Sequence, residues 1–486
     1  MSEYVVDASG AGDFATLGAA SKAAQPGDVF TIRRGTYRET LNVNVGGVVW
    51  QAEEGALLDG GWRGGPDGTG WSSLITVSAA GCMVEGFTVM NSPGRGIVVN
   101  ASDTLLANCY VENTFHGGLM IGNGAGPAIS NAVVRDCVFT KMSQSWVTEK
   151  RPTAVNGSVN IHNVVDSVFE GNTVCDGWGE GINIGRNSQR VIVRGNEVYS
   201  CNHVLLYVNR CQDCVIEANL LYHIPDPVYG GKAGDSFSAG IVIGDERGKV
   251  LDRFPFSRGN VIRENLVVNT GKMLQVRNNN IEDGYDTALT DTIIDNNSFV
   301  AGPVTVTGIE IKSNQRGRQH SNSYFRHNAI CFSNSAAKAD IGTFGGAGVT
   351  FERNAWSMLP PQSMRTAADV VGDLMLTDEA ATIAKIDSVH TNFDREHYRP
   401  LVESPLVAGA TIGALDAIVP PPPPPPDPPE MDYQWLVEEL AMAKERVARA
   451  AERSAEAMER SEEAGTAAGE ALVQVDELIA LLQAKQ

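Results

Sequence analysis

The sequence lacks several features that would place it in common classes. It has no apolar run of about 18 residues, so we expect no membrane insertion. Basic residues are few: 38 Lys and Arg stand against 58 Asp and Glu, which gives a formal net charge of -20. Nucleic acid selects basic surfaces, so we expect no nucleic-acid partner. An acidic polymer would be repelled unless a local basic patch or a bound cation compensated.

The sequence also lacks a signal-peptide pattern and a zinc-binding cysteine motif. The opening residues, MSEYVVDASG, lack a basic region followed by an apolar one, so no ordinary signal peptide is expected. We therefore expect that the protein either stays in the cell or leaves it by another route, such as release in a phage virion or export without a leader. The eight cysteines fall mostly in or beside short apolar segments, as small buried side chains of a reducing compartment do. Cys211 and Cys214, with His203 and His223 nearby, lack the second CxxC or His pair that a zinc site needs.

What the sequence does have is a repeat. Residues 169–174 (FEGNTV) are answered by residues 193–198 (VRGNEV), and residues 181–185 (GINIG) lie between them. Each segment alternates apolar and polar side chains over about five residues and ends at a turn residue, which is typical of strands. One slot of the repeat holds asparagine at Asn172, Asn196, Asn219, Asn265, Asn297, Asn328 and Asn354, and holds Phe87, Cys109 and Cys137 upstream.

The repeat predicts an all-β solenoid. Its closest spacings, about 22 to 24 residues, are those of stacked coils that bury their apolar faces only against one another. Short strands with no helical period between them indicate a parallel β-helix, with the repeated Asn bonding from coil to coil. We expect residues 1–40 to form an N-terminal cap and first coil, with a helix over 14–24 that ends at Pro26-Gly27. Residues 41–418 are expected to form the β-helix.

Both ends of this region carry recognisable segments. They are Phe14-Ala15-Thr16-Leu17, Pro26-Gly27-Asp28 and Gly35-Thr36-Tyr37-Arg38-Glu39 at the start, and Tyr398-Arg399-Pro400-Leu401, Ser404-Pro405-Leu406 and Ile412-Gly413-Ala414 at the end. Together with the repeats, they resemble the right-handed parallel β-helix superfamily of pectate lyases, alginate lyases and phage tailspikes. The resemblance covers roughly residues 1–418 and implies a right-handed, single-stranded β-helix with an N-terminal capping helix. This scaffold carries lyases, hydrolases, esterases and pure binders, so activity has to be argued from a site.

Strand alternation predicts a binding face. If Ile182 and Ile184 point inward, Asn183 points outward. Long insertions fall at two fixed points of the repeat and would form walls on either side of this sheet. The sheet would then be the floor of a groove that binds a surface polysaccharide, although an outward sheet face is polar in any case. The predicted floor residues are Val98, Met120, Asn160, His162, Asn183, Tyr207, Val242, Gln275, Arg277, Glu310 and Lys312, and Trp146 on a wall loop would stack on sugar rings.

Three constellations could supply chemistry. Asp176 and Glu180, with Glu149 on a neighbouring loop, are candidates for the acid and base of a glycosidase, unless they are simply solvated turn residues. Residues 308–317 resemble a segment of alginate and chondroitin lyases; the resemblance implies that Glu310 binds Ca²⁺ and that a nearby base abstracts the C5 proton. Gln315 stands where that family has lysine, so Lys312 or Arg316 would have to act. The third constellation, an alternative Ca²⁺ site or a solvated loop, is Glu282, Asp283 and Asp286.

The C-terminal part has a different composition. Seven prolines at 420–426 begin a polyproline linker, which we place at 419–430. Residues 431–486 are rich in Ala, Glu and Arg, and small or apolar residues recur at 3-4 spacing from Leu436 to Leu482, as in a coiled coil. A helix with so narrow a stripe favours self-association, and tailspike β-helices suggest a homotrimer; a helical hairpin or a helix docked on the solenoid is the alternative.

These features leave three functional hypotheses open. The first is a phage tailspike- or fibre-like virion protein that contacts other virion proteins and binds a cell-surface polysaccharide, with depolymerisation of that polysaccharide left open. The second is a bacterial polysaccharide lyase of the alginate or chondroitin lyase type. The third is a structural spike without catalysis. The sequence leaves open whether the chain is an enzyme and, if so, whether it is a lyase or a glycoside hydrolase.

Overall fold

The computed structural model describes residues 2–64, 72–122, 126–145, 157–224, 239–247, 251–277, 286–312, 317–332, 340–345 and 347–372. All of them lie in the first of the two units into which the chain divides, Met1–Val419. Trp146, Arg316, the closing segments at 398–414, the linker at 419–430 and the helical segment at 431–486 lie outside the described residues, so the expectations for them stay predictions. Among the described residues, no helix is long and apolar enough to cross a membrane.

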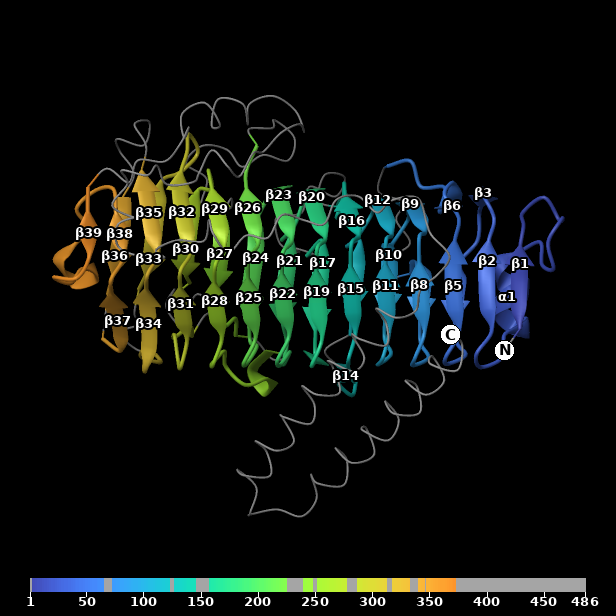
Figure 1. The fold of residues 1–486 in the computed structure, drawn as a ribbon, viewed down its shortest axis with the longest axis horizontal. Helices are drawn as coiled ribbons and strands as arrows, with labels where there is room; N and C mark the ends of the chain where they lie inside the picture. The colour runs from blue at the N-terminus through green and yellow to red at the C-terminus, as the bar shows by residue number, and fades with distance from the viewer. Residues whose placement is uncertain are drawn as a thin grey trace, which may run out of the picture. The chain divides into compact units, whose positions relative to one another are not determined.

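The described residues fold into three long parallel sheets, and successive strands of a coil enter the three sheets in turn (Figure 1). The first sheet contains, in spatial order, β1 (Glu3–Val6), β2 (Val29–Ile32), β5 (Val49–Ala52), β8 (Met83–Glu85), β11 (Leu105–Ala107), β15 (Val133–Arg135), β19 (Val168–Glu170), β22 (Ile192–Arg194), β25 (Val215–Glu217), β28 (Val261–Arg263), β31 (Ile293–Asp295), β34 (Ser323–Arg326) and β37 (Val349–Glu352). The second contains β3 (Gly35–Tyr37), β6 (Ala56–Asp59), β9 (Thr88–Ser92), β12 (Tyr110–Thr114), β16 (Val138–Thr140), β20 (Thr173–Gly177), β23 (Glu197–Cys201), β26 (Leu220–Tyr222), β29 (Leu266–Val268), β32 (Ser298–Ala301), β35 (Ala329–Phe332), β38 (Ala355–Trp356) and β39 (Val370–Val371).

The third, 11-stranded sheet carries the predicted binding face. Its strands are β4 (Leu41–Val43), β7 (Ser73–Val77), β10 (Arg95–Val99), β13 (Leu119–Ile121), β17 (Val159–His162), β21 (Ile182–Gly185), β24 (Val204–Asn209), β27 (Ala239–Ile243), β30 (Lys272–Val276), β33 (Thr307–Ile311) and β36 (Asp340–Phe344). The remaining described elements are a small pair, β14 (Ile129–Ser130) and β18 (Val164–Val165), and the short 3₁₀ helices η1 (Leu251–Arg253) and η3 (Gln362–Met364). The all-β, parallel solenoid predicted from the repeat is confirmed.

A buried asparagine ladder joins the coils. In each coil from Asn172 to Asn328, the side-chain oxygen of the next asparagine accepts the backbone N–H of the previous one, at 2.9–3.0 Å. The ladder begins where Cys137 N donates to Asn172 and ends where Asn354 N donates to Asp369 Oδ1, both at 3.0 Å. The predicted amide ladder is therefore confirmed, with a carboxylate as its last member.

A left-handed turn residue precedes each ladder position. Gly171 and Gly195 have φ of +62° and +61°, and Ala218 adopts +54° in the same place. Glycine takes this conformation without the steric cost that a Cβ brings. The turn bends the chain from the first sheet into the second and aims the following asparagine into the interior, which explains why a turn residue and Asn occur together in the repeat.

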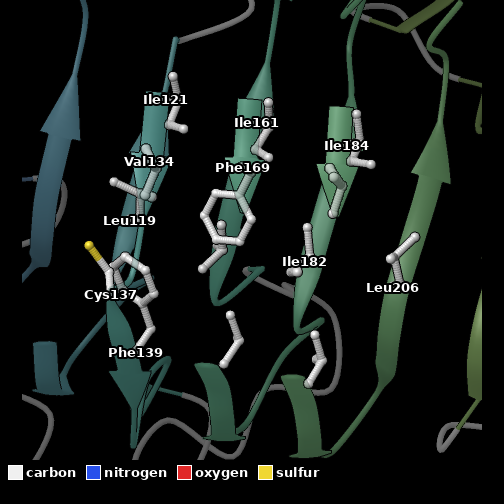
Figure 2. Close-up of a cluster of buried hydrophobic side chains, with 14 of the residues drawn as sticks. Leu119, Ile121, Val134, Cys137, Phe139, Ile161, Phe169, Ile182, Ile184 and Leu206 are labelled. Carbon is white, nitrogen blue, oxygen red and sulfur yellow. The ribbon is translucent and has the colours of Figure 1, made fainter. Parts of the chain in front are cut away.

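The interior is a continuous stack of apolar side chains. Figure 2 shows Leu119, Ile161, Ile182 and their neighbours pointing inward from successive strands. Like residues stack on like: the rings of Phe30 and Trp50 lie 4.4 Å apart, and those of Phe139 and Phe169 lie 6.3 Å apart. All eight cysteines are buried and free, which confirms their interpretation as small buried side chains.

One helix, α1 (Leu17–Ala23), lies at the N-terminal end of the stack (Figure 1). Thr16 caps it by accepting the N–H of Ala19, and Glu39 accepts the N–H groups of Leu17 and Gly18, both at 2.9 Å. The helix begins later than the predicted residue 14, because Phe14 instead packs its ring against Tyr4 and Phe30.

Candidate functional site

The predicted floor residues form one continuous row. Strand pairing places Val98, Met120, Asn160, Asn183, Tyr207, Val242, Gln275 and Glu310 side by side across the 11-stranded sheet. His162 pairs with Gly185 two positions further along the strands. Arg277 and Lys312 directly follow β30 and β33 at the same edge. The alternation in the sequence thus predicted which residues form this row and their register.

This row is only slightly exposed, which differs from the open groove floor that was predicted. Asn160, His162, Asn183 and Gln275 are 4–8% exposed, and Tyr207 is fully buried. Some of the polar atoms bond within the protein: Asn160 Nδ2 donates to the carbonyl of Gly157 at 2.7 Å. The Tyr207 hydroxyl donates to Glu246 Oε1 at 2.9 Å. Alternation gives the direction of a side chain but not what covers it, so the sequence could not show this burial.

The first cluster of polar side chains along this row surrounds Glu180, which lies in the turn before β21. We call Glu180, Asn183, His203 and His162 the Glu180 group. Asn183 Nδ2 donates to Glu180 Oε2, and His203 Nδ1 lies 3.9 Å from Glu180 Oε1. That distance is longer than a hydrogen bond, so the two groups face each other without sharing a proton. Within the described residues, His162 Nδ1 and Asn183 Oδ1 are buried without a hydrogen-bond partner.

The surroundings drive the pKa values of this group apart. Burial raises the pKa of Glu180 to about 8, and the charge of Glu246 adds to the effect, while the Asn183 hydrogen bond opposes it. Burial lowers the pKa of His203 to about 4, and Arg277 lowers it further. Burial, followed by the charge of Arg186, lowers the pKa of His162 to about 3. At neutral pH, Glu180 therefore carries a proton and His203 carries none, which is the division of roles between an acid and a base.

Asp176, the other carboxylate predicted for this site, lies in a different element from Glu180. It lies at the end of β20 in the second sheet, in a left-handed conformation with φ of +52°. Its charge raises the pKa values of Cys175, Cys201, Tyr110 and Tyr199. It is not among the main groups that act on Glu180, where Glu246 is the neighbouring carboxylate. The structure thus places Asp176 in the second sheet and Glu180 in the turn before β21, and the Asp176–Glu180 pair stays a prediction.

The second concentration is around Glu310, and we call Lys272, Gln275, Glu310 and Lys312 the Glu310 group. Lys272 Nζ lies 3.1 and 3.2 Å from the two carboxylate oxygens, and Lys312 Nζ donates to Oε2 at 2.9 Å. Gln275 Nε2 donates to Oε1 at 2.7 Å. Burial acts to raise the pKa of Glu310, but the bonds from Lys312, Gln275 and Lys272 outweigh it, so the pKa is lowered.

The Glu310 group does not fit the calcium site that the resemblance implies. Ca²⁺ needs six to eight oxygen ligands, whereas Glu310 already accepts a bond from each of three donors, two of them cationic. Among the residues that the structure describes, no group of three or more His, Cys, Asp or Glu side chains could hold a metal ion. In the alternative Ca²⁺ loop, Asp286 instead accepts the N–H of Arg318 at 2.8 Å, and Glu282 and Asp283 lie outside the described residues.

A third polar cluster fixes an inserted loop. Asp245, fully buried after β27, accepts bonds from Ser257 Oγ at 2.6 Å and from Arg318 Nη1 at 3.0 Å. The guanidinium groups of Arg210 and Arg318 each lie 4.2 Å from the centre of the Phe256 ring. Phe256 therefore packs against two guanidinium groups. The sequence analysis missed this cluster, because its members come from loops that have no periodicity.

Comparisons with known proteins agree with this architecture. Residues 73–265 match the family described as "Right handed beta helix region". No curated protein matches the chain at the level of sequence. Among solved structures, the alginate lyase AlyGC has a TM-score of 0.56 at 13% identity, over 88% of this chain and 60% of that one. A rhamnogalacturonan lyase has a TM-score of 0.53 at 12% identity (85% and 100%), and pectate lyase Pel9A has 0.51 at 15% (84% and 90%).

The fold that the resemblance implied is thereby confirmed: this chain has a right-handed parallel β-helix fold, similar to that of the pectate lyase and the alginate lyase. At these identities the likeness concerns the fold alone. The chain spans 60% of the length of the alginate lyase AlyGC.

Proposed function

We propose that the chain is a carbohydrate-acting β-helix protein that binds a polysaccharide along the 11-stranded sheet and cleaves it beside Glu180. The observation that carries this proposal is the Glu180 group. A protonated carboxylic acid and a neutral imidazole lie 3.9 Å apart there, beside buried polar atoms of His162 and Asn183 that have no partner within the described residues. Buried polar atoms are costly without partners, and sugar hydroxyls would provide them. The solved polysaccharide lyases support the proposal as examples of the fold.

The Glu180 group can support general acid–base cleavage. Glu180 would donate its proton to the glycosidic oxygen as the carbon–oxygen bond breaks. His203 would accept the proton released by an attacking water in hydrolysis, or by the sugar carbon in an elimination. In both routes Glu180 ends without its proton and His203 ends with one taken from the water or the sugar. Both routes therefore need Glu180 protonated and His203 neutral at the start, which are the protonation states that burial favours.

The test is a panel of alginate, pectate, chondroitin and bacterial capsule, with binding, new reducing ends and new unsaturated uronate absorbance as readouts. We expect Asn183→Ala to weaken glycan binding about tenfold, because it removes one buried hydrogen-bonding group from the row. Asn42→Ala is the matched control, since Asn42 lies in the same sheet in register with Thr76 but is exposed at the N-terminal end. Absence of binding to every glycan, or equal losses in the two variants, would contradict the proposal.

We further propose that the chain is a phage virion component, tailspike- or fibre-like, that trimerises through residues 431–486 and recognises a cell-surface polysaccharide. Support comes from the heptad pattern behind a proline linker. An exported polysaccharide lyase is the alternative, and it leaves the helical segment unexplained. In the same proposal, α1 closes the open N-terminal end of the solenoid, because its Leu17 and Ala20 are fully buried in the core, as the side chains of a terminal cap must be.

For the trimer, we expect light scattering on the full chain to give the mass of three 51.9 kDa copies. Leu478→Asp places a charge in the apolar seam and should reduce the mass toward that of one copy, because a buried unpaired charge is costly. Ala480→Asp, which adds the same charge two residues away on the outer side of the heptad, should leave the mass unchanged. A monomeric parent protein would overturn the trimer.

A further inference from the structure

Cys211 and Cys214 lie together in one tight corner of the solenoid. They fall between β24 of the third sheet and β25 of the first, and both side chains are fully buried. Arg210 and Asp213 have left-handed conformations there, with φ of +59° and +55°. Two left-handed residues within four positions bend the chain sharply, so the Cys-x-x-Cys segment forms a turn whose two ends stay close to each other.

The side chain of Asn260, in the next coil, holds both cysteines. Its Nδ2 donates to the carbonyl oxygen of Cys211 at 3.1 Å, and its Oδ1 accepts the backbone N–H of Cys214 at 3.0 Å. The Cys211 sulfur lies 3.8 Å from the same Oδ1. The neighbouring Cys214 thiol, followed by burial, raises the pKa of Cys211 well above its ordinary value. The two thiols are therefore close neighbours in the interior, and the proposed cleavage uses neither of them.

We propose that Cys211 and Cys214 form a redox pair, which holds two thiols in a reducing cell and closes into a disulfide when the chain meets an oxidising medium. The inference goes beyond the proposed function, because it needs no glycan. It fits a chain that is made inside a cell and works outside it, since such a chain passes from reducing to oxidising surroundings.

The oxidant in this step is a small-molecule disulfide, such as oxidised glutathione. One protein sulfur attacks it and forms a mixed disulfide, which releases the first small thiol. The second protein sulfur then attacks the mixed disulfide, so that the Cys211–Cys214 bond forms and the second small thiol leaves. The two protein thiols lose two protons and two electrons in total, and the two released thiols take them up.

Burial controls the rate of this step. Thiolate is the attacking form, and the raised pKa of Cys211 makes it scarce, while both sulfur atoms are shielded from solvent. The Cys211 N–H donates to Ser257 Oγ at 3.3 Å, and Ser257 Oγ donates to the buried Asp245 at 2.6 Å, which keeps the corner closed. Oxidation should therefore be slow in the folded chain and fast in a chain that folds in the presence of the oxidant.

The experiment counts free thiols in the full chain by alkylation under denaturing conditions and mass spectrometry. One sample is the folded chain incubated with oxidised glutathione in EDTA, and the other is the chain synthesised in a cell-free system buffered with reduced and oxidised glutathione. We expect a fall from eight free thiols to six, with the disulfide mapped to Cys211 and Cys214. Cys211→Ser should form no internal disulfide. Cys82→Ser, at a buried cysteine in another coil, is the matched control and should still lose two thiols.

A second readout is the melting temperature. A disulfide that closes a four-residue ring removes little chain entropy, so we expect oxidation to raise the melting temperature by only about 2 °C and a reducing agent to reverse the rise. Cys211→Ser should show no such shift. Eight free thiols in both samples, or a disulfide between other cysteines such as Cys109 and Cys137, would overturn the inference. An oxidised pair in a chain that binds no glycan would support it and refute only the proposed function.

Discussion

Replacing Asn265 by leucine is expected to lower the free energy of unfolding by about 4 kcal/mol, because several buried polar groups lose their partners at once. Asn265 Oδ1 accepts the backbone and side-chain N–H groups of Asn219 at 3.0 and 2.9 Å. Its Nδ2 donates to the carbonyl of Ile216 and to Asn297 Oδ1. Leucine has a similar size, so the loss reports on hydrogen bonds rather than on a cavity.

Denaturant unfolding followed by circular dichroism measures this loss. Asn42→Ala is the control, because Asn42 is exposed and its side chain makes only a 3.4 Å contact with Thr40. A surface change of this kind shifts stability by no more than about 0.5 kcal/mol. If Asn265→Leu unfolded at the same denaturant concentration as the control, the asparagine ladder would not be a main source of stability.

The second large effect is expected for Glu180→Gln, which should remove a pH dependence as well as catalysis. Glutamine keeps the shape of the protonated acid but has no proton to donate, so we expect cleavage of a bound glycan to fall at least ~100-fold. The control is Glu54→Gln at an exposed glutamate, which should change neither readout. Cleavage that survives in Glu180→Gln would exclude Glu180 as the acid.

The pH dependence has a definite sign. The pKa of Glu180 is about 8 in the folded protein, above its ordinary 4.5. Between these values the folded state holds more protons than the unfolded state, so stability falls as pH rises, by up to ~1.4 kcal/mol per pH unit. Glu180→Gln lacks this slope and should gain on the parent steadily from pH 5 to pH 8. Parallel unfolding curves for the two proteins over that range would refute the raised pKa.

The buried imidazoles act in the opposite direction. His203, His162 and His223 have pKa values of about 4, 3 and 4, below the ordinary 6.5. Below pH 6.5 the unfolded state takes up more protons than the folded state, so their contribution to stability is lost as pH falls toward those values. Below pH 6.5 the three imidazoles outweigh the one carboxyl, and above it Glu180 dominates, so the parent should be most stable just above pH 6.5.

The sequence predicted the parts of this molecule that repeat. The regular recurrence of Asn172, Asn196 and Asn219 located the ladder, and the alternation around Asn183 placed residues from Val98 to Glu310 in one row. Both predictions rest on periodicity, and a solenoid repeats its backbone geometry from coil to coil, so a position identified in one coil transfers to the next.

The parts that the sequence did not predict break that periodicity. In β30 the consecutive residues Met273 and Leu274 are both in the core, which breaks the alternation, and both Lys272 and Gln275 reach Glu310. Simple alternation therefore gave no reason to place Lys272 beside Glu310. Glu180 lies in a turn, where no period applies, and its protonation depends on burial that only the three-dimensional arrangement shows.

The cluster around Asp245 changes how cooperatively the coils of the solenoid unfold. In a simple solenoid, each coil contacts only the coils directly before and after it. Here Arg318 reaches past the coil that carries Thr287 to bond Asp245, and Asp245 also accepts the N–H of Arg210 one coil earlier. These hydrogen bonds therefore connect side chains and backbone groups of four successive coils. This stretch of the stack should thus open as one cooperative unit rather than coil by coil, from β24 to β33.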